Sequence, residues 1–315
     1  MNNRYHQKVI SILLLSFFIY CADVSFCQSP GCLPRQPVED VAGRFEISAH
    51  LGATTFFGDL GGNRGRGGPF AKDFDFRTIH SLTGLSLAYY PENYYKIKLS
   101  VNRTFVDGAD SLIHNYGDAE RWRWYRNLSF RSNILEGSVE AEFYPLIWLS
   151  KTNTVRWFDP FFSIGLGAFH FNPQAKLNDE WIDLQPLHLE GQGFSEYPDR
   201  KPYSLTQFYI PYSLGAKYYL NDSWSISGSL LWRRTFTDYI DDISTTYIDP
   251  VLFDKNLPGP KAALAKQLYS RSLTPWKVKP NVAKADQRDR DSYVTLLVTV
   301  SYVMAKRKVI YYGGF

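Results

Sequence analysis

Hydrophobic and polar residues alternate most regularly along this chain between Ser204 and Thr237. In the first half of that stretch the apolar side chains share one parity: Phe208, Ile210, Tyr212, Leu214, Ala216, Tyr218 and Leu220. A period of two is typical of a β-strand, because successive side chains point to opposite faces of the sheet. Asn221 and Asp222 then supply a turn, and the alternation resumes as far as Trp232. The stretch predicts a β-hairpin whose arms approach the roughly 9–11 residues that cross a bilayer at a tilt.

The same alternation recurs in six further segments. They cover about residues 44–51, 82–90, 96–101, 134–144, 162–168 and 294–302. Long and short connections alternate between the strands, which is typical of an outer-membrane barrel with long extracellular loops and short periplasmic turns. The sequence therefore predicts an all-β fold: an eight-stranded antiparallel transmembrane β-barrel over residues 44–304, with long extracellular loops.

Loop length also predicts which parts of the chain face the cell exterior. With both termini in the periplasm, Trp122, Glu190 and Asp241 lie outside the cell, whereas Lys151 and Asn221 lie in the periplasm. This topology puts the protein in the cell outer membrane, where its partners include the membrane lipids and lipopolysaccharide.

Charged residues occupy the parity opposite to the apolar one, so they face the barrel interior. Lys96 and Lys98 lie on the third predicted strand, and Glu140 and Glu142 lie at the same depth on the fourth. Eight strands enclose an interior that side chains just fill, which excludes a diffusion porin. An unpaired charge would be costly there. We therefore expect these lysines and glutamates to form ion pairs.

The N-terminal residues indicate export. Arg4 and Lys8 precede an apolar run that ends at Cys21 and is too short for a membrane helix. We expect residues 1–27 to be a cleaved signal peptide, 28–43 a periplasmic lead and 305–315 a periplasmic tail. Cleavage before Gln28 leaves Cys32 as the remaining cysteine, which excludes an internal disulfide.

Composition adds two constraints. Aromatic residues make up 17% of the 315 residues, which suits long strands and the aromatic girdles of a membrane barrel. The net charge of +4 comes from 35 basic and 31 acidic residues, so the charge balance gives no case for a nucleic-acid partner.

One predicted loop carries a basic and aromatic run. It begins with Arg121, Trp122, Arg123 and Trp124. Such residues stack on nucleic-acid bases in some proteins, but an exported barrel loop is better suited to lipid phosphates and sugars, with tryptophan at the membrane interface. We interpret the run as a contact surface for the membrane or its saccharides.

A second loop carries an acidic run that includes Asp238, Asp241 and Asp242. Carboxylates are suitable calcium ligands, but the run lacks the spacing and the glycine of an EF-hand loop. We interpret these residues as a solvated loop beside lipopolysaccharide, with calcium binding as the alternative. The histidines are scattered and no nucleophile motif occurs, so the sequence predicts no cofactor, no metal and no enzymatic activity.

Several segments together carry a family resemblance. They are FEISAHLGATTFFGDLGG, RNLSFRSNILEGSVEAEFYPL, Gly-Ala-Lys-Tyr at 215–218 and Arg-Thr-Phe-Thr-Asp-Tyr at 234–239. Over about residues 45–302 the chain resembles the outer-membrane barrels of Bacteroidota grouped with PorG, a component of the type IX secretion and gliding machinery. The resemblance implies a barrel that anchors a protein secretion assembly through periplasmic ring subunits. It implies no catalytic residues.

The loops differ from that family in size, especially residues 237–290. This difference leaves open a second hypothesis, a surface barrel whose long loops bind an extracellular ligand.

A periplasmic partner would have to contact the connection at 145–159 or the C-terminal tail. The apolar and aromatic candidates for that contact are Leu146, Trp148, Leu149, Val155, Arg156 and Trp157. Trp and Arg often anchor protein interfaces, although Trp148 and Trp157 would fit the periplasmic aromatic girdle equally well.

Overall fold

The structure is a computed structural model, and it describes residues 40–60, 76–113, 117–150, 157–274, 278–285 and 290–304. Its strands are β1 (Phe45–Phe57), β2 (His80–Glu92), β3 (Tyr95–Ala109), β4 (Ser129–Phe143), β5 (Phe158–Leu177), β6 (Glu180–Asp183), β7 (Thr206–Tyr219), β8 (Trp224–Thr235) and β9 (Ser292–Val303). The α-helices are α2 (Asp118–Arg126), α3 (Pro145–Leu149), α4 (Val251–Asn256) and α5 (Gly259–Leu268). Three short 3-10 helices cover Phe76–Thr78, Asp110–Leu112 and Gln185–Leu187. The predicted signal peptide and tail lie outside the described residues, as does the predicted lead except for its last residues.

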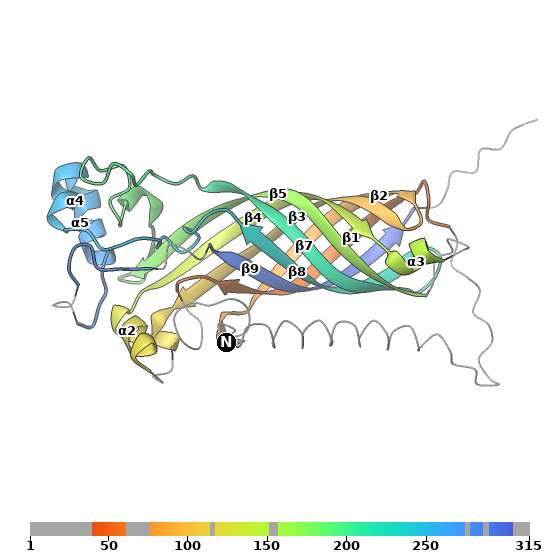
Figure 1. Ribbon diagram of the computed structural model, residues 1–315, viewed down its shortest axis with the longest axis horizontal. Coiled ribbons are helices and arrows are strands. Elements are labelled where there is room, and N and C mark those ends of the chain that lie inside the picture. The colour runs from red at the N-terminus through yellow and green to blue at the C-terminus, as the bar shows by residue number, and fades with distance from the viewer. Residues whose placement is uncertain are drawn as a thin grey trace, which may run out of the picture. The chain divides into compact units, whose positions relative to one another are not determined.

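Eight of the strands close into an antiparallel barrel (Figure 1). Sequence neighbours pair around the wall, β1 pairs with β9, and β4 pairs with β5 to complete the circle. β6 is outside this circle and extends β5 as a short hairpin. The predicted fold class and strand number are therefore confirmed.

The two ends of the barrel are built differently (Figure 1). One end, called the loop end below, carries α2, α4 and α5. The other, called the α3 end, carries α3 and the short connections β2–β3 and β7–β8. Long and short connections are thus sorted to opposite ends, as loop length predicted.

β5 extends well beyond the predicted 162–168. Its inward residues change from Ser163 and Gly167 near the α3 end to Phe169 and Phe171 near the loop end, and both phenylalanines are buried. The predicted strand was too short because polar residues were expected at the inward positions. In this half of the lumen the inward positions carry aromatic rings instead. Gly167 makes room for one of them, since a Cβ there would lie 2.4 Å from the Tyr209 ring.

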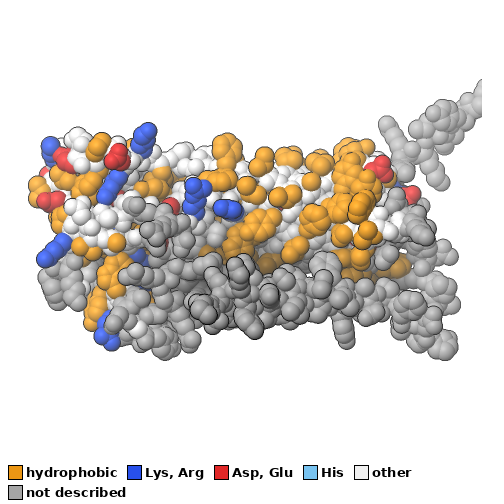
Figure 2. Space-filling view, in the orientation of Figure 1, with side chains coloured by type: hydrophobic (Ala, Val, Ile, Leu, Met, Phe, Trp, Pro, Cys, Tyr) orange, Lys and Arg blue, Asp and Glu red, His pale blue; other side chains and the backbone are white. Residues whose placement is uncertain are grey.

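The outer wall of the barrel is apolar. Outward side chains such as Leu166 and Phe208 are 71% and 73% exposed, and Figure 2 shows hydrophobic groups spread over the wall. Aromatic pairs mark both edges: Trp224–Tyr302 toward the α3 end and Phe57–Trp232 toward the loop end. On β8 these edges are about 26 Å apart along the strand, or about 20 Å along the axis at a tilt of ~40°. This height approaches the roughly 25 Å of the apolar band that outer-membrane barrels present to lipid.

The lumen is filled in three layers. An apolar layer at the α3 end consists of Val41, Tyr90, Tyr144, Ile147, Phe161, Tyr219 and Val303. Next to it, toward the loop end, lies the middle layer, which consists of buried ion pairs. The layer at the loop end consists of Phe56, Leu60, Val106, Leu128, Phe130, Ile134, Phe169, Phe171, Tyr209, Ile240, Ile243 and Tyr293.

The long connections fold together into a loop domain, defined as residues 58–60, 76–79, 110–113, 117–128, 178–205, 236–274, 278–285 and 290–291. It has a hydrophobic core of its own, which packs α4 and α5 against residues 184–194 and the end of β5. The core residues are Ala175, Leu184, Leu187, Leu189, Phe194, Ile248, Phe253, Ala262, Ala265 and Leu268. Residues 237–290, predicted as a plain loop, therefore contain two helices and part of a core.

Candidate functional site

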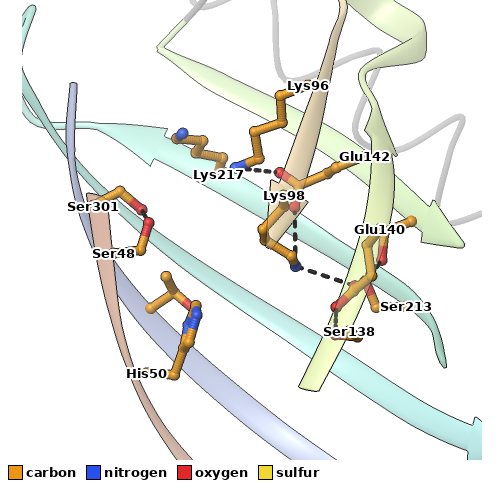
Figure 3. Close-up of polar contacts among 12 residues, drawn as sticks. Ser48, His50, Lys96, Lys98, Ser138, Glu140, Glu142, Ser213, Lys217 and Ser301 are labelled. Atoms are coloured by element: carbon orange, nitrogen blue, oxygen red, sulfur yellow. Dashed lines mark hydrogen bonds and ion pairs between the residues drawn. The ribbon is translucent and has the colours of Figure 1, made fainter. Parts of the chain in front are cut away.

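The ion pairs of the lumen follow from the register of β3 and β4. Lys96 faces Glu142 and Lys98 faces Glu140 as cross-strand partners. Lys96 Nζ lies 2.8 Å from Glu142 Oε1, and Lys98 Nζ lies 3.2 Å from Glu140 Oε2 and 3.5 Å from Glu142 Oε2. The structure thus links all four predicted interior residues through a chain of ion pairs (Figure 3).

Glu46 on β1 joins this cluster from across the lumen. It is fully buried and accepts hydrogen bonds from Lys96 Nζ at 2.7 Å, from Tyr90 Oη at 2.8 Å and from Lys217 Nζ on β7. Three lysines (96, 98 and 217) and three glutamates (46, 140 and 142) therefore compensate one another. Buried charges persist in proteins when they are paired and hydrogen-bonded in this way.

A second buried pair lies between β4 and β8. Arg233 and Glu136 are 0% and 2% exposed, and Arg233 Nη2 lies 2.6 Å from Glu136 Oε1. Tyr293 Oη and Asn102 Nδ2 also donate to the Glu136 carboxylate, at 2.6 Å and 3.0 Å. Arg233 Nη1 donates to Thr295 Oγ1 at 2.5 Å. The guanidinium and the carboxylate each form hydrogen bonds with residues of more than one strand. These bonds connect opposite sides of the barrel wall.

α2 presents two faces with different surroundings. Arg121, Trp122 and Trp124 are exposed, as expected for a contact surface. Arg123 is 4% exposed, so its assignment to an outer contact surface is wrong. Arg126, at the end of α2, is buried on the same side. The helical period causes this division, because residues three apart share one face of a helix.

Arg126 anchors α2 to other parts of the loop domain. Its Nε and Nη2 lie 2.7 Å and 2.8 Å from the two carboxylate oxygens of Asp110. Nη1 donates to the Lys284 carbonyl at 2.5 Å, and Nη2 also donates to the Asp59 carbonyl at 2.7 Å. One guanidinium therefore joins parts of three long connections.

The acidic run is not solvated, which corrects the interpretation from sequence. Asp241 and Asp242 are each 1% exposed. Asp241 accepts hydrogen bonds from the Leu60 and Ile243 amides, and Asp242 Oδ1 accepts one from Tyr203 Oη at 2.5 Å. Burial raises the pKa of Asp242 to about 7 and that of Asp238 to about 9. These side chains hold segments of the loop domain together and are not available as an outer contact surface.

Glu190 organises the centre of the loop domain. It is fully buried and accepts hydrogen bonds from the Thr245 amide at 2.9 Å and the Thr245 hydroxyl at 2.6 Å. Lys284 Nζ lies 3.7 Å from its carboxylate. Arg200 strengthens the same junction by donating to the Glu190 carbonyl at 2.7 Å and to Thr246 Oγ1 at 2.7 Å.

The α3 end carries the predicted periplasmic contacts. On α3, Leu146 is half-buried, whereas Trp148 and Leu149 are 56% and 69% exposed. The Trp148 ring lies 5.9 Å from the ring of the outward-facing Phe143, which places it beside the aromatic girdle. Trp157 packs against the apolar layer of this end. Lys151, Val155 and Arg156 lie outside the described residues.

Two absences concern the described residues only. Among these residues, no group of three or more His, Cys, Asp or Glu side chains is placed to hold a metal ion. None of the described helices is long and apolar enough to cross a membrane.

Similarity to known proteins is found among solved structures alone. No protein-family model and no curated protein matches the chain. Among solved structures, it is similar to the N-terminal β-barrel domain of OprF from Pseudomonas aeruginosa (11% identity, TM-score 0.33, 84% of this chain and 100% of that chain). It is also similar to the outer membrane protein OprG from the same organism (13% identity, TM-score 0.35, 84% of this chain and 97% of that chain). A third similar structure is the outer membrane protein AlkL in lipid bilayers (10% identity, TM-score 0.33, 90% of this chain and 100% of that chain).

Sequence patterns could locate the pairs on neighbouring strands but not the pairs across the lumen. The partners of Lys98 follow from the order of β3 and β4 alone, whereas the pairs Glu46–Lys217 and Glu136–Arg233 depend on how the barrel closes. For the pairs across the lumen, the sequence showed only that charged residues occupy inward positions of the strands. Glu190 gave no comparable signal, because it lies in a segment without periodicity.

Proposed function

We propose that this protein is a non-enzymatic outer-membrane barrel that acts as a closed membrane anchor and displays its loop domain for binding at the cell surface. The filled lumen is the observation that carries this proposal. Both ends are packed with apolar side chains, and the charges between them are buried and paired. Such a barrel offers no aqueous path for a solute.

The order of the loop domain supports the binding role. Fixing a residue's backbone costs roughly 1–2 kcal/mol of conformational entropy, and the domain offsets that cost with its own core and with buried pairs such as Arg126–Asp110. Loops that a rigid scaffold positions in this way often carry the binding function of a protein.

Conductance in planar lipid bilayers tests the closed anchor. The purified full chain should insert without conductance steps. A variant with Lys96, Lys98, Glu140 and Glu142 all changed to Ala, which empties part of the middle layer, should remain non-conducting because both apolar layers persist. Stable channels in the unmodified protein would overturn the closed anchor.

Anchoring of a type IX-like secretion and gliding assembly is the second candidate. Leu149 favours it, because this apolar side chain is exposed at the α3 end on a short helix. In the expected topology this end faces the periplasm, where ring subunits would dock.

A matched pair of variants tests this second candidate. Leu149→Asp should weaken crosslinking to periplasmic subunits and impair cargo secretion, while the amount of inserted barrel stays constant. Leu220→Asp is the control, since Leu220 is exposed at the same end but lies outside α3. Equal secretion from both variants, in cells where deletion of the gene blocks secretion, would exclude this docking surface.

A further inference from the structure

A cavity of about 310 Å³ opens between α2 and the connection from β8 to β9. This volume is at the lower end of the roughly 300–1,000 Å³ that small-molecule sites occupy. Its lining includes Arg121, Trp122, Tyr125, Tyr247 and Thr274. Arg121 and Trp122 belong to the run interpreted from sequence as a contact surface, but neither the closed anchor nor the docking surface at the α3 end uses the cavity.

Hydrogen bonds hold the two walls of the cavity together. The Leu273 amide and the Ser272 hydroxyl both donate to the Tyr125 carbonyl, at 2.9 Å and 3.0 Å. Asn127 ends α2 in the left-handed conformation, with φ of 54°, and its Nδ2 donates to the Arg271 carbonyl at 3.1 Å. The shape of the cavity therefore does not depend on a ligand.

The two guanidinium groups at the cavity differ in availability. Arg126 is buried and its charge is compensated by Asp110. Arg121 is exposed and makes no ion pair with any described residue. An arginine in this state matches carboxylate, sulfate or phosphate groups through two parallel hydrogen bonds.

The remaining lining is aromatic with a hydroxyl. Trp122 is 42% exposed, and the Arg126 guanidinium carbon lies 5.3 Å from its ring centroid. The half-buried Tyr125 adds a further ring, and the largely buried Tyr247 and Thr274, 3% and 8% exposed, add the edge of a ring and a hydroxyl to the lining. Aromatic rings offer an apolar face that fits the C–H face of a sugar, while hydroxyl and guanidinium groups bind its oxygens.

We propose that this cavity binds an anionic saccharide. The sugar ring packs on Trp122, its acidic group pairs with Arg121, and a sugar hydroxyl bonds to Thr274. The inference rests on the proposed display of the loop domain at the cell surface. There the same chemistry occurs in two forms, as lipopolysaccharide in the same membrane and as free acidic polysaccharide.

Titration of the detergent-solubilised full chain, followed by calorimetry, tests the site. The probes are trigalacturonate as a free acidic saccharide, purified rough lipopolysaccharide as the lipid-borne form, and maltotriose as the neutral control. At least one acidic probe should bind, and maltotriose should bind at least tenfold more weakly. Binding of trigalacturonate alone identifies a free polysaccharide, and binding of lipopolysaccharide alone identifies the membrane-borne form.

Matched variants locate the binding. Arg121→Gln and Trp122→Ala should each weaken the binding of the acidic probe at least tenfold. Arg234→Gln removes the same charge from an exposed position on β8, and Trp124→Ala removes an exposed ring from the same helix outside the cavity. Both controls should stay within twofold of the unmodified protein. All four residues bear exposed side chains, and circular dichroism checks that each variant is folded.

Three results would overturn the saccharide site. They are no binding of either acidic probe, equal losses in the variants and their controls, and tighter binding of hexaglutamate, an acidic peptide, than of both saccharides. The absence of conductance and the surface labelling of the loop domain do not depend on this site, so its failure is distinguishable from failure of the proposed function.

Discussion

The guanidinium of Arg233 on β8 donates to both carboxylate oxygens of Glu136 on β4, at 2.6 Å from Nη2 to Oε1 and 3.0 Å from Nε to Oε2. β5 and β7 separate these two strands along the wall, so the pair crosses the lumen. Both side chains are buried, and their hydrogen bonds reach Asn102 on β3 as well as Tyr293 and Thr295 on β9. The pair connects the barrel wall through its interior.

Removing one partner of this pair should be costlier than removing both. Arg233→Met or Glu136→Gln alone leaves an uncompensated buried charge, which typically costs about 3–5 kcal/mol. The double variant leaves neither charge, so its free energy of unfolding should lie above that of either single variant. Urea unfolding in lipid vesicles measures the difference. Additive losses in the double variant would contradict the pairing.

The middle layer should respond unequally to loss of its glutamates. Glu46→Gln takes a charged partner from two lysines, Lys96 and Lys217, whereas Glu140→Gln takes one from Lys98, which retains Glu142. We expect Glu46→Gln to lower the free energy of unfolding by about 3 kcal/mol or more. Glu140→Gln should lower it by less. The same urea assay compares the two variants, and an equal loss would show that Glu46 is not the shared partner.

Stability of the loop domain should fall as pH rises. Burial raises the pKa of Asp242 from 3.8 to about 7. Attraction to Lys284 opposes this effect and repulsion by Glu190 adds to it. The folded state therefore holds a proton that the unfolded chain releases near pH 4, so stability is lost between about pH 4 and pH 7. Thermal melts followed by near-UV circular dichroism should show a lower midpoint at pH 8 than at pH 4.

Asp242→Asn separates this titration from other causes. The amide keeps the shape of the protonated carboxyl and cannot ionise, so the variant should match the unmodified protein at pH 4 and exceed its stability at pH 8. Some pH dependence should remain, because burial also raises the pKa of Asp238 to about 9. An equal loss of stability at both pH values would mean that the position needs a carboxylate.

Labelling of single cysteines tests the topology, with different reporters from those the sequence suggested. Asp241 and Glu190 are buried and would not report on their side of the membrane. In a Cys32→Ser background, Val251→Cys, at a 65% exposed position on α4, should react with an impermeant maleimide in intact cells. Glu92→Cys, at the end of β2 beside one short turn, and Asp222→Cys, in the other short turn, should react only after the outer membrane is permeabilised.

A buried control and a reversed outcome complete the labelling experiment. Leu231→Cys, at a position 4% exposed in the lumen, should remain unlabelled in both conditions. Labelling of Glu92→Cys and Asp222→Cys in intact cells, with protection of Val251→Cys, would invert the topology.

The periodicity of the sequence was enough to predict the barrel but not the layers of side chains inside it. Outward residues such as Leu85 and Val139 were predictable because lipid demands apolar side chains along the whole strand. Inward positions follow no single rule: Glu140 belongs to an ionic layer, whereas Phe169 belongs to an aromatic one. The loop domain was hidden for a related reason, since the burial of Asp241 and Asp242 depends on contacts with chain segments far away in sequence.

The shared position of Glu46 has an evolutionary consequence. Replacement of Lys217 leaves part of the Glu46 charge uncompensated, and replacement of Glu46 removes a partner from two lysines. Each single substitution therefore passes through a less stable barrel. Positions 46, 96, 142 and 217 should therefore covary among descendants of this chain, changing together or not at all. Lipid-facing positions such as Leu166 carry no such constraint and can drift among apolar residues.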